Sequence, residues 1–144
     1  AENYQIFKDA FEKQVSSTIL PEMRTPEIEI DAEINFSDIT PKLIRILKQF
    51  EPFGPQNMTP VFMTKDIKDT GYAKTLGSEE EHLRLFVKQS NSDGIAAIGF
   101  GLGKKLSIAQ NQNLFQLAYS LAENEWNGTI STQLMLKDIR TNDN

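Results

Sequence analysis

Two stretches near the start of the chain carry apolar residues at the three-to-four spacing that is typical of one helix face. The first stretch covers residues 3–19, and four residues form its apolar face: Tyr4, Phe7, Phe11 and Val15. The second covers residues 37–50, where Thr40 suits the N-cap and Pro41 the first helical position. The first helix needs a surface to cover, so it either packs on the domain that follows or closes a domain that precedes it.

Residues 27–36 show a different pattern, in which every even position is apolar and every odd position is acidic or polar. This period of two predicts a β-strand with one buried face and one anionic face. The carboxylates of Glu29, Asp31 and Glu33 could suggest a divalent-metal site. No His joins them, however, and successive carboxylates on one face of a strand diverge, so we interpret them as a solvated face.

A rigid turn follows over residues 51–62, which contain three prolines and a glycine. Proline fixes φ and removes a backbone donor, and glycine permits positive φ, so neither a helix nor a central strand can run through this stretch. Four apolar residues lie within it: Phe53, Met58, Val61 and Phe62. We therefore expect a turn that packs against a core, placed between helical pattern before it and strand pattern after it.

From residue 60 onward the pattern is that of short strands. Strands are expected at 61–68, 82–89, 95–100, 114–123 and 130–139, with a short helix at 104–109. Residues 72–76 either continue the first of these strands or begin another. Asn127 and Gly128 suit a type I′ hairpin turn. About five strands with a late helical insertion predict a mainly β fold with flanking helices (α+β). The expected architecture is a five-stranded OB-fold-like barrel preceded by two helices and a connecting strand.

Composition and charge limit the possible functions. The chain of 144 residues has no Cys, which excludes disulfides and thiolate metal sites and fits a reducing, cytoplasmic location. No apolar run approaches the roughly 18 residues of a transmembrane helix, so no membrane association is expected. Residues 1–40 hold nine acidic and three basic side chains (net −6), which leaves +1 for the rest of the chain's net −5. A local basic surface therefore remains compatible with the overall acidity.

Few residues could perform catalysis. The single His, His82, argues against a His-based triad or a His-ligated metal, and we expect it on the surface at the start of a strand. Residues 99–105 contain three glycines and two lysines, which hints at a phosphate-binding loop. The P-loop spacing would need Gly where Ile98 stands and Ser or Thr where Lys105 stands. The residues thus indicate a binding module rather than an enzyme.

The outward side of residues 82–89 offers a candidate ligand surface. Arg84, Phe86 and Lys88 place an aromatic ring between two cations, which suits single-stranded nucleic acid because bases stack on the ring and phosphates meet the cations. Trp126, near a loop tip, is a second candidate for stacking. Further phosphate contacts are expected from Lys65, Lys104, Lys137 and Arg140. Alternatively, the N-terminal helix covers Phe86, and Trp126 caps the barrel.

The run Glu51-Pro52-Phe53-Gly54, followed by Asn57 and Pro60-Val61-Phe62, resembles the E-P-F-G-x-G-N-P-x-P-V-F signature of RecJ-type single-stranded-DNA exonucleases. The resemblance continues at residues 28–33, 82–85, 98–101, 124–128, 133–134 and 137–140, in order and at matching spacing. The chain departs from the signature at Gln56, where the family usually has Gly, and at Met58, where it usually has Pro. Both changes affect the backbone of the turn.

The resemblance implies part of a hydrolase that degrades single-stranded DNA 5′ to 3′ in repair and recombination. The family's metal-binding Asp/His motifs lie in a DHH domain, and a Gly-Gly-His motif lies in the following DHHA1 domain. Neither motif occurs in this chain, so no catalytic residue is carried over, and the parent's Mn²⁺ or Mg²⁺ belongs to those domains. The opening residues Ala1, Glu2 and Asn3 fit an excised segment.

The same resemblance implies three regions. Residues 1–25 would be the terminal helix of a truncated DHHA1 domain, 26–59 the connecting strand, helix and turn, and 60–144 the nucleic-acid-binding domain. The expected partners are single-stranded DNA and the catalytic DHH and DHHA1 domains. A protein-docking module is the alternative, because residues 27–35 are acidic and the barrel carries little charge. It would brace the catalytic domains or receive a partner such as single-strand binding protein.

Overall fold

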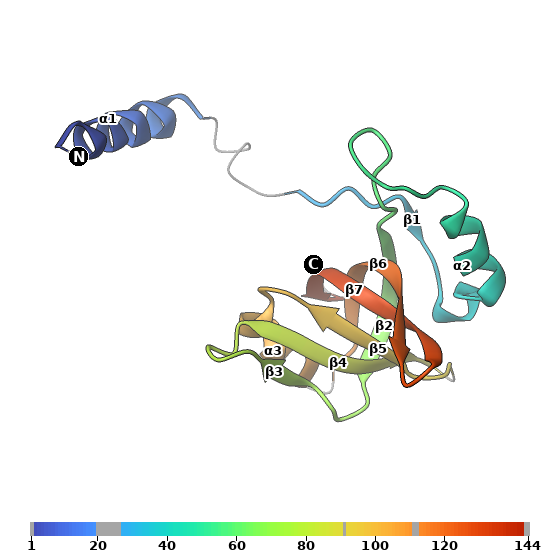
Figure 1. Ribbon diagram of the computed structural model, residues 1–144. Helices are drawn as coiled ribbons and strands as arrows, with labels where there is room; N and C mark the ends of the chain where they lie inside the picture. Colours follow the sequence, from blue (N-terminus) through green and yellow to red (C-terminus); the bar gives the residue numbers. More distant parts are fainter. Residues whose placement is uncertain (1, 20–26, 91, 111–112, 143–144) are drawn as a thin grey trace.

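A computed structural model describes residues 2–19, 27–90, 92–110 and 113–142. The first helix, α1 (Glu2–Thr18), confirms the expected helix and lies apart from the barrel (Figure 1). Its aromatic side chains Tyr4, Phe7 and Phe11 are 57–69% exposed. The structure therefore does not show α1 packed on the domain that follows. No helix among the described residues combines the length and the apolar character needed to cross a membrane.

The second helix, α2 (Pro41–Lys48), begins as predicted and is shorter than expected. The hydroxyl of Thr40 accepts a hydrogen bond from the Leu43 amide at 3.3 Å, so it caps the helix. Residues before this cap form a separate 3₁₀ turn, η2 (Phe36–Asp38). The Asp38 carboxylate closes that turn by accepting a hydrogen bond from the Asn35 amide at 2.8 Å.

The prediction of a strand over residues 27–36 is wrong in extent. Only β1 (Ala32–Glu33) forms a ladder, and it runs parallel to the start of β2 (Phe62–Asp69). The Asp31 carboxylate accepts a hydrogen bond from the Val61 amide at 2.8 Å. The 3₁₀ turn η2 then directs the chain away from β2. The alternation still sets burial, because even positions from residue 30 to 36 face inward and odd ones are exposed.

Polar contacts of Asn57 hold the Pro-rich turn together. Its backbone exchanges two hydrogen bonds of 2.9 Å with Gly54, and its side-chain amide donates to the carbonyls of Phe50 and Pro52 at 2.7 and 3.0 Å. Met58 is 76% exposed, so the expectation that it anchors the turn on the core is wrong. Gln56 has a φ of 67°, a left-handed conformation that explains why the related signature has Gly there.

Six strands, together with β1, build the sheet. They are β2, β3 (Lys74–Leu76), β4 (His82–Gln89), β5 (Ile95–Gly99), β6 (Phe115–Trp126) and β7 (Thr129–Thr141). The pairing order β2–β4–β5–β7–β6–β2 closes a five-stranded barrel, to which β1 and β3 add at the edges. A short helical insertion, η3 (Gly103–Lys105) and α3 (Leu106–Gln110), separates β5 from β6. The predicted OB-fold-like barrel is confirmed.

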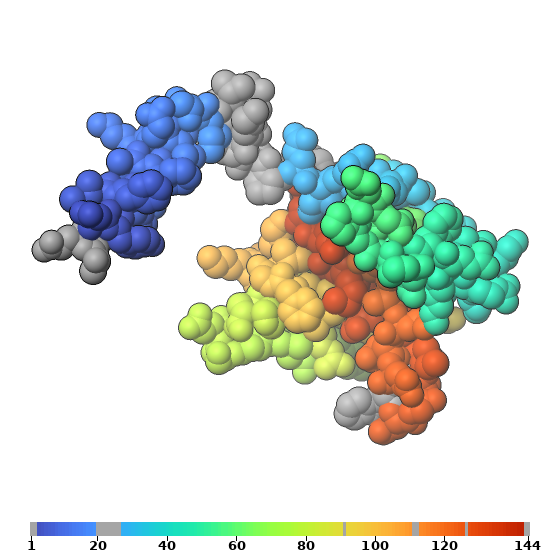
Figure 2. Space-filling view, turned by 45° about the horizontal axis from the view of Figure 1, so that its top comes forward, coloured from blue at the N-terminus to red at the C-terminus, as the bar shows by residue number. Residues whose placement is uncertain are grey.

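The barrel encloses one hydrophobic core. Its largest fully buried side chains are Tyr119, Phe115, Ile67, Leu83, Leu85, Leu117, Leu134 and Ile139. The Tyr119 hydroxyl lies 2.7 Å from the Thr64 hydroxyl, and burial raises the pKa of Tyr119 to about 12. Figure 2 shows residues 27–60 as a continuous layer on one side of the barrel. The outer face of β4 and β5 does not lie beneath that layer.

Candidate nucleic-acid interface

The outer face of β4 presents the predicted ligand surface. Three alternate residues of this strand are buried in the core: Leu83, Leu85 and Val87. Because successive side chains of a strand point to opposite faces, Arg84, Phe86 and Lys88 point outward. Phe86 is 40% exposed, and Figure 1 shows α1 well away from β4. The alternative that the N-terminal helix covers Phe86 is therefore not what the structure shows.

Neighbouring strands widen this face. Arg84 lies opposite Lys74 on β3 and opposite Ile98 on β5, and Ile98 in turn lies opposite Met135 on β7. Directly opposite residues in a sheet share a face and lie about 4.5–5.5 Å apart. These residues form a row across β3, β4, β5 and β7, with the two cations next to each other at the β3 end. Lys74 was not singled out from the sequence, because its place beside Arg84 depends on the β3–β4 pairing.

A second aromatic ring stands beside Phe86. The ring centroids of Tyr72 and Phe86 are 6.4 Å apart, with the ring planes at 89°. Phe86 lies over Gly94, where an added Cβ would come within 2.3 Å of the Phe86 ring. Tyr72, Lys74, Arg84 and Phe86 together line a shallow groove. The sequence places Tyr72 in strand pattern at 72–76, whereas β3 begins at Lys74, so Tyr72 lies in an irregular segment where periodicity gives no orientation.

The carboxylate of Asp69 sets the position of Tyr72. One of its oxygens accepts hydrogen bonds from the amides of Gly71, Tyr72 and Ala73 at 2.7, 2.8 and 3.0 Å. The other oxygen accepts from the Phe86 amide at 3.1 Å. A carboxylate that receives four backbone donors binds them strongly. Asp69 therefore fixes the loop that carries Tyr72 to the strand that carries Phe86.

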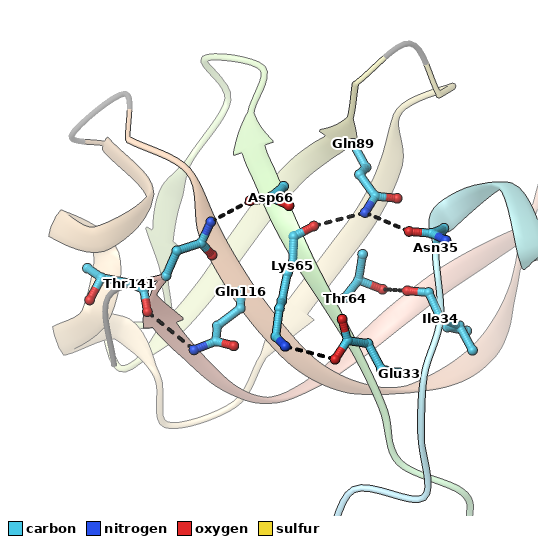
Figure 3. Close-up of polar contacts among 10 residues, drawn as sticks. Glu33, Ile34, Asn35, Thr64, Lys65, Asp66, Gln89, Gln116 and Thr141 are labelled. Carbon is cyan, nitrogen blue, oxygen red and sulfur yellow. Dashed lines mark hydrogen bonds and ion pairs between the residues drawn. The ribbon is translucent and has the colours of Figure 1, made fainter.

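Two of the predicted phosphate-binding residues have acidic partners elsewhere on the barrel. Lys65 reaches Glu33 at 2.8 Å across the β1–β2 pair (Figure 3). Arg140, near the end of β7, donates from Nε to Asp138 at 2.9 Å. The structure thus does not place either cation with the β4 group. Their predicted role in DNA binding stays a prediction.

The other two predicted lysines have no ion-pair partner in the part of the chain that the structure describes. Lys137 is exposed and is the extra residue of a bulge in β7, because Leu136 pairs with Tyr119 and Asp138 with Ala118. Lys104 is exposed on η3, whose Gly103 amide donates to the carbonyl of Glu81 at 2.9 Å. Lys104 therefore lies close to the β3–β4 connection.

Trp126 ends β6, opposite Thr129 on β7, and its side chain lies outside what the structure describes. The turn beside it is the predicted hairpin. Asn127 and Gly128 both have positive φ, at 50° and 75°, as a type I′ turn requires.

Neither the acidic residues before α2 nor His82 forms a metal site. Within the described ranges, no group of three or more His, Asp or Glu side chains could hold a metal ion. Glu33 pairs with Lys65 and Asp31 binds the Val61 amide, so both carboxylates have structural partners. His82 is half-buried at the start of β4, and its ring centroid lies 5.0 Å from that of Phe100.

Asp138 joins η3 to β7 through a small charged cluster. It accepts hydrogen bonds from the side chains of Lys105 and Arg140 and from the amide of Ile139. Burial alone would raise the pKa of Asp138, but the two cations and the amide outweigh it, so the pKa is lowered from its ordinary value of 3.8. The cluster stabilises the barrel and occupies Arg140.

Comparison with known proteins identifies the family and the fold of the chain. Residues 30–138 match the family described as RecJ OB domain. The chain is 23% identical over 140 residues to the single-stranded-DNA-specific exonuclease RecJ of Bacillus subtilis (strain 168), covering 96% of this chain and 17% of that protein. It is 24% identical over 145 residues to RecJ of Escherichia coli (strain K12), covering 96% and 23%. The chain therefore spans about a fifth of the length of these relatives.

Two solved structures share the fold. RecJ from Thermus thermophilus in complex with Mn²⁺ superposes with a TM-score of 0.65 at 23% identity, over 95% of this chain and 19% of that chain. The same protein in complex with Mg²⁺ gives 0.61 at 22% identity, over 95% and 20%.

Asp138→Asn should destabilise the fold by roughly 1–3 kcal/mol at neutral pH, because Lys105 and Arg140 lose a charged partner. The folded-state pKa of Asp138 lies below 3.8. Its contribution is therefore complete above 3.8 and is lost as the pH falls through the lower folded value. Urea unfolding of both proteins across pH 7 to 2 checks this, with Asp93→Asn as the control. A difference that stays constant down to pH 2 would contradict the assignment.

Proposed function

The chain belongs to the RecJ OB domain family, and from this premise we propose that it holds or guides single-stranded DNA for a RecJ-type 5′→3′ exonuclease in repair and recombination. One observation carries the proposal: Phe86 and Tyr72 stand among Lys74, Arg84 and Lys88, which have no ion-pair partner within the described residues. In five-stranded barrels of this class the second and third strands bind oligonucleotides. Here those strands are β4 and β5.

The geometry suits a strand whose bases are unpaired. Bases can stack on Phe86, with Tyr72 standing edge-on beside it, and each stacked base contributes roughly 1–3 kcal/mol. Lys74 and Arg84 lie side by side, so one phosphate can contact both. The acidic residues of the 27–38 segment lie along the β1 side of the barrel. Salt screens their charge from this face over about 10 Å at 0.1 M.

Catalysis is assigned to the rest of the parent protein. The parent would be a hydrolase that uses Mn²⁺ or Mg²⁺ held by its DHH and DHHA1 domains, in the cytoplasm. The described residues contain no cluster of His, Asp or Glu side chains that could hold such a metal. In this proposal the chain binds the DNA and does not cleave it. Release of nucleotides from single-stranded DNA by the purified chain with Mn²⁺ would contradict this division of roles.

A second function, protein docking, is favoured by a groove between α2 and the β6–β7 hairpin. Ile39, Ile44 and Ile130 line this groove together with Arg45, and Arg45 has no ion pair among the residues described. An acidic, apolar segment would fit such a surface. The catalytic domains or a partner such as single-strand binding protein could supply it.

We propose that residues 1–25 are the last helix of the DHHA1 domain, with Tyr4, Phe7 and Phe11 packing on that domain in the parent. The stacked rings of Phe7 and Phe11, 5.8 Å apart, are exposed in this chain. Deletion of residues 1–26 should then change the free energy of unfolding of the barrel by no more than about 0.5 kcal/mol. Leu134→Ala in the core should cost roughly 2–5 kcal/mol in the same urea titration. A comparable loss on deletion would show that α1 supports the barrel instead.

Phe86→Ala should weaken binding of a fluorescent single-stranded oligonucleotide by roughly 1–3 kcal/mol, because one stacking surface is lost. Arg84→Ala should lower the slope of log affinity against log salt by about 0.7, the value for one phosphate contact on a single strand. Fluorescence anisotropy at several salt concentrations measures both, with Ile130→Ala as the control. If neither variant changes the affinity, the docking function is favoured over DNA grip.

Asp69→Ala tests the positioning of Tyr72 through the sign of its effect. Removal of an acidic group from a basic face would strengthen DNA binding by electrostatics alone. We expect weaker binding, several-fold or more, because the loop that carries Tyr72 loses its anchor. Asp93→Ala is the matched control, since the Asp93 carboxylate makes no hydrogen bond among the described residues. Tighter binding by a folded Asp69→Ala protein would refute the positioning role.

A further inference from the structure

We propose that Phe100 and His82 form a second base-stacking platform on the barrel, which would take a further one or two nucleotides of the same single strand. The proposal rests on the proposed function and extends the bound path beyond the Phe86 group. The ring centroids of His82 and Phe100 are 5.0 Å apart, with the planes at 75°. Phe100 is 61% exposed, so most of its ring is free to meet a ligand.

The register of the sheet puts both aromatic pairs on one face. Leu83 pairs with Gly99 and Arg84 with Ile98 in the antiparallel β4–β5 ladder. His82 precedes Leu83 and Phe100 follows Gly99, so the two residues lie where that ladder ends. His82 shares the outward side of β4 with Arg84 and Phe86. His82 and Phe86 are four positions apart, which corresponds to about 13 Å along a strand. A single strand that follows β4 would therefore pass both pairs.

Fixed contacts hold the platform in place before any ligand binds. The His82 Nδ1 atom accepts a hydrogen bond from the Gly101 amide at 3.2 Å. Its Nε2 atom faces the Glu81 carboxylate at 3.6 Å. That carboxylate also accepts a hydrogen bond from the Glu79 amide at 3.0 Å. The His82 imidazole, held by these contacts and by the Phe100 ring, loses little conformational freedom when a ligand binds, which favours affinity.

A cation stands beside the Phe100–His82 platform. Arg84 follows His82 by two residues on β4 and so lies between the platform and Phe86. Arg84 has no ion pair in the described part of the chain. A cation between aromatic rings suits single-stranded nucleic acid, because bases stack on the rings and phosphates meet the cation.

The test compares oligo-dT ligands of about 4 and about 12 nucleotides, within the range of site sizes for such barrels. Fluorescence anisotropy gives the affinity of each for the 144-residue chain. Phe100→Ala should weaken binding of the longer ligand by about 5- to 150-fold, and should reduce the gain in affinity that lengthening brings. Phe100→Tyr, which keeps the ring, should bind like the unchanged protein. Met58→Ala is the control, because Met58 is an exposed apolar side chain on the Pro-rich turn and belongs to neither proposed binding surface.

A second readout reports on the platform directly. The NMR signal of the Gly101 amide, which binds His82, should shift when the longer ligand is added, and should shift less in Phe100→Ala. If Phe86→Ala weakens binding while Phe100→Ala changes neither affinity nor that signal, the platform is refuted and the DNA-binding function stands. If Phe86→Ala is also without effect, or the unchanged chain does not bind, the DNA-binding function itself fails and the platform with it.

Discussion

One extra residue in β2 allows a single strand to pair with two neighbours, and closure of the barrel depends on it. The register with β6 shifts between Thr64 and Ile67, where Asp66 adopts a φ of 56°. Before this bulge β2 pairs with β6, at Ile67 it pairs with both β6 and β4, and Lys68 and Asp69 pair with β4. A bulge bends a strand and increases its twist, so the end of β2 reaches the β4–β5 hairpin. Closure places β2 beside residues 87–89 of β4, which β3 does not reach.

The bulge exposes backbone groups that other parts of the chain must satisfy. Gln89, at the end of β4, donates to the freed Lys65 carbonyl at 2.9 Å and to the Asn35 side chain at 3.2 Å (Figure 3). The side-chain oxygen Oε1 of Gln89 accepts a hydrogen bond from the Phe36 amide at 3.0 Å. One side chain therefore joins the bulge, the β4 strand and the segment that leads to α2. The connecting segment packs on the barrel through these polar contacts as well as through Phe36.

The sequence predicts local features well and pairing between distant residues poorly. The alternation of apolar and polar residues in β4 predicts which side chains face outward. The N-cap at Thr40 and the hairpin turn at Asn127 are predicted from the local preferences of these residue types. Alternation in residues 27–36 correctly predicts which side chains from residue 30 onward face inward. It does not show whether a neighbouring strand is present to form hydrogen bonds with this segment. The sequence could not separate Lys65 from the cations proposed to bind DNA, because its partner Glu33 lies 32 residues away. Tyr72 depends likewise on the contacts of Asp69.

Charge is distributed so that an acidic chain can still present a basic face. Lys65 is paired with Glu33, and Lys105 and Arg140 are paired with Asp138, so the carboxylates near β1 and on β7 neutralise the cations beside them. On the β4 face the Asp69 carboxylate binds the backbone amides of Gly71, Tyr72, Ala73 and Phe86 rather than a cation. Local potential rather than net charge steers a charged ligand. A phosphate chain would therefore approach the barrel from the β4 side, along the line of Phe86, Arg84 and Phe100.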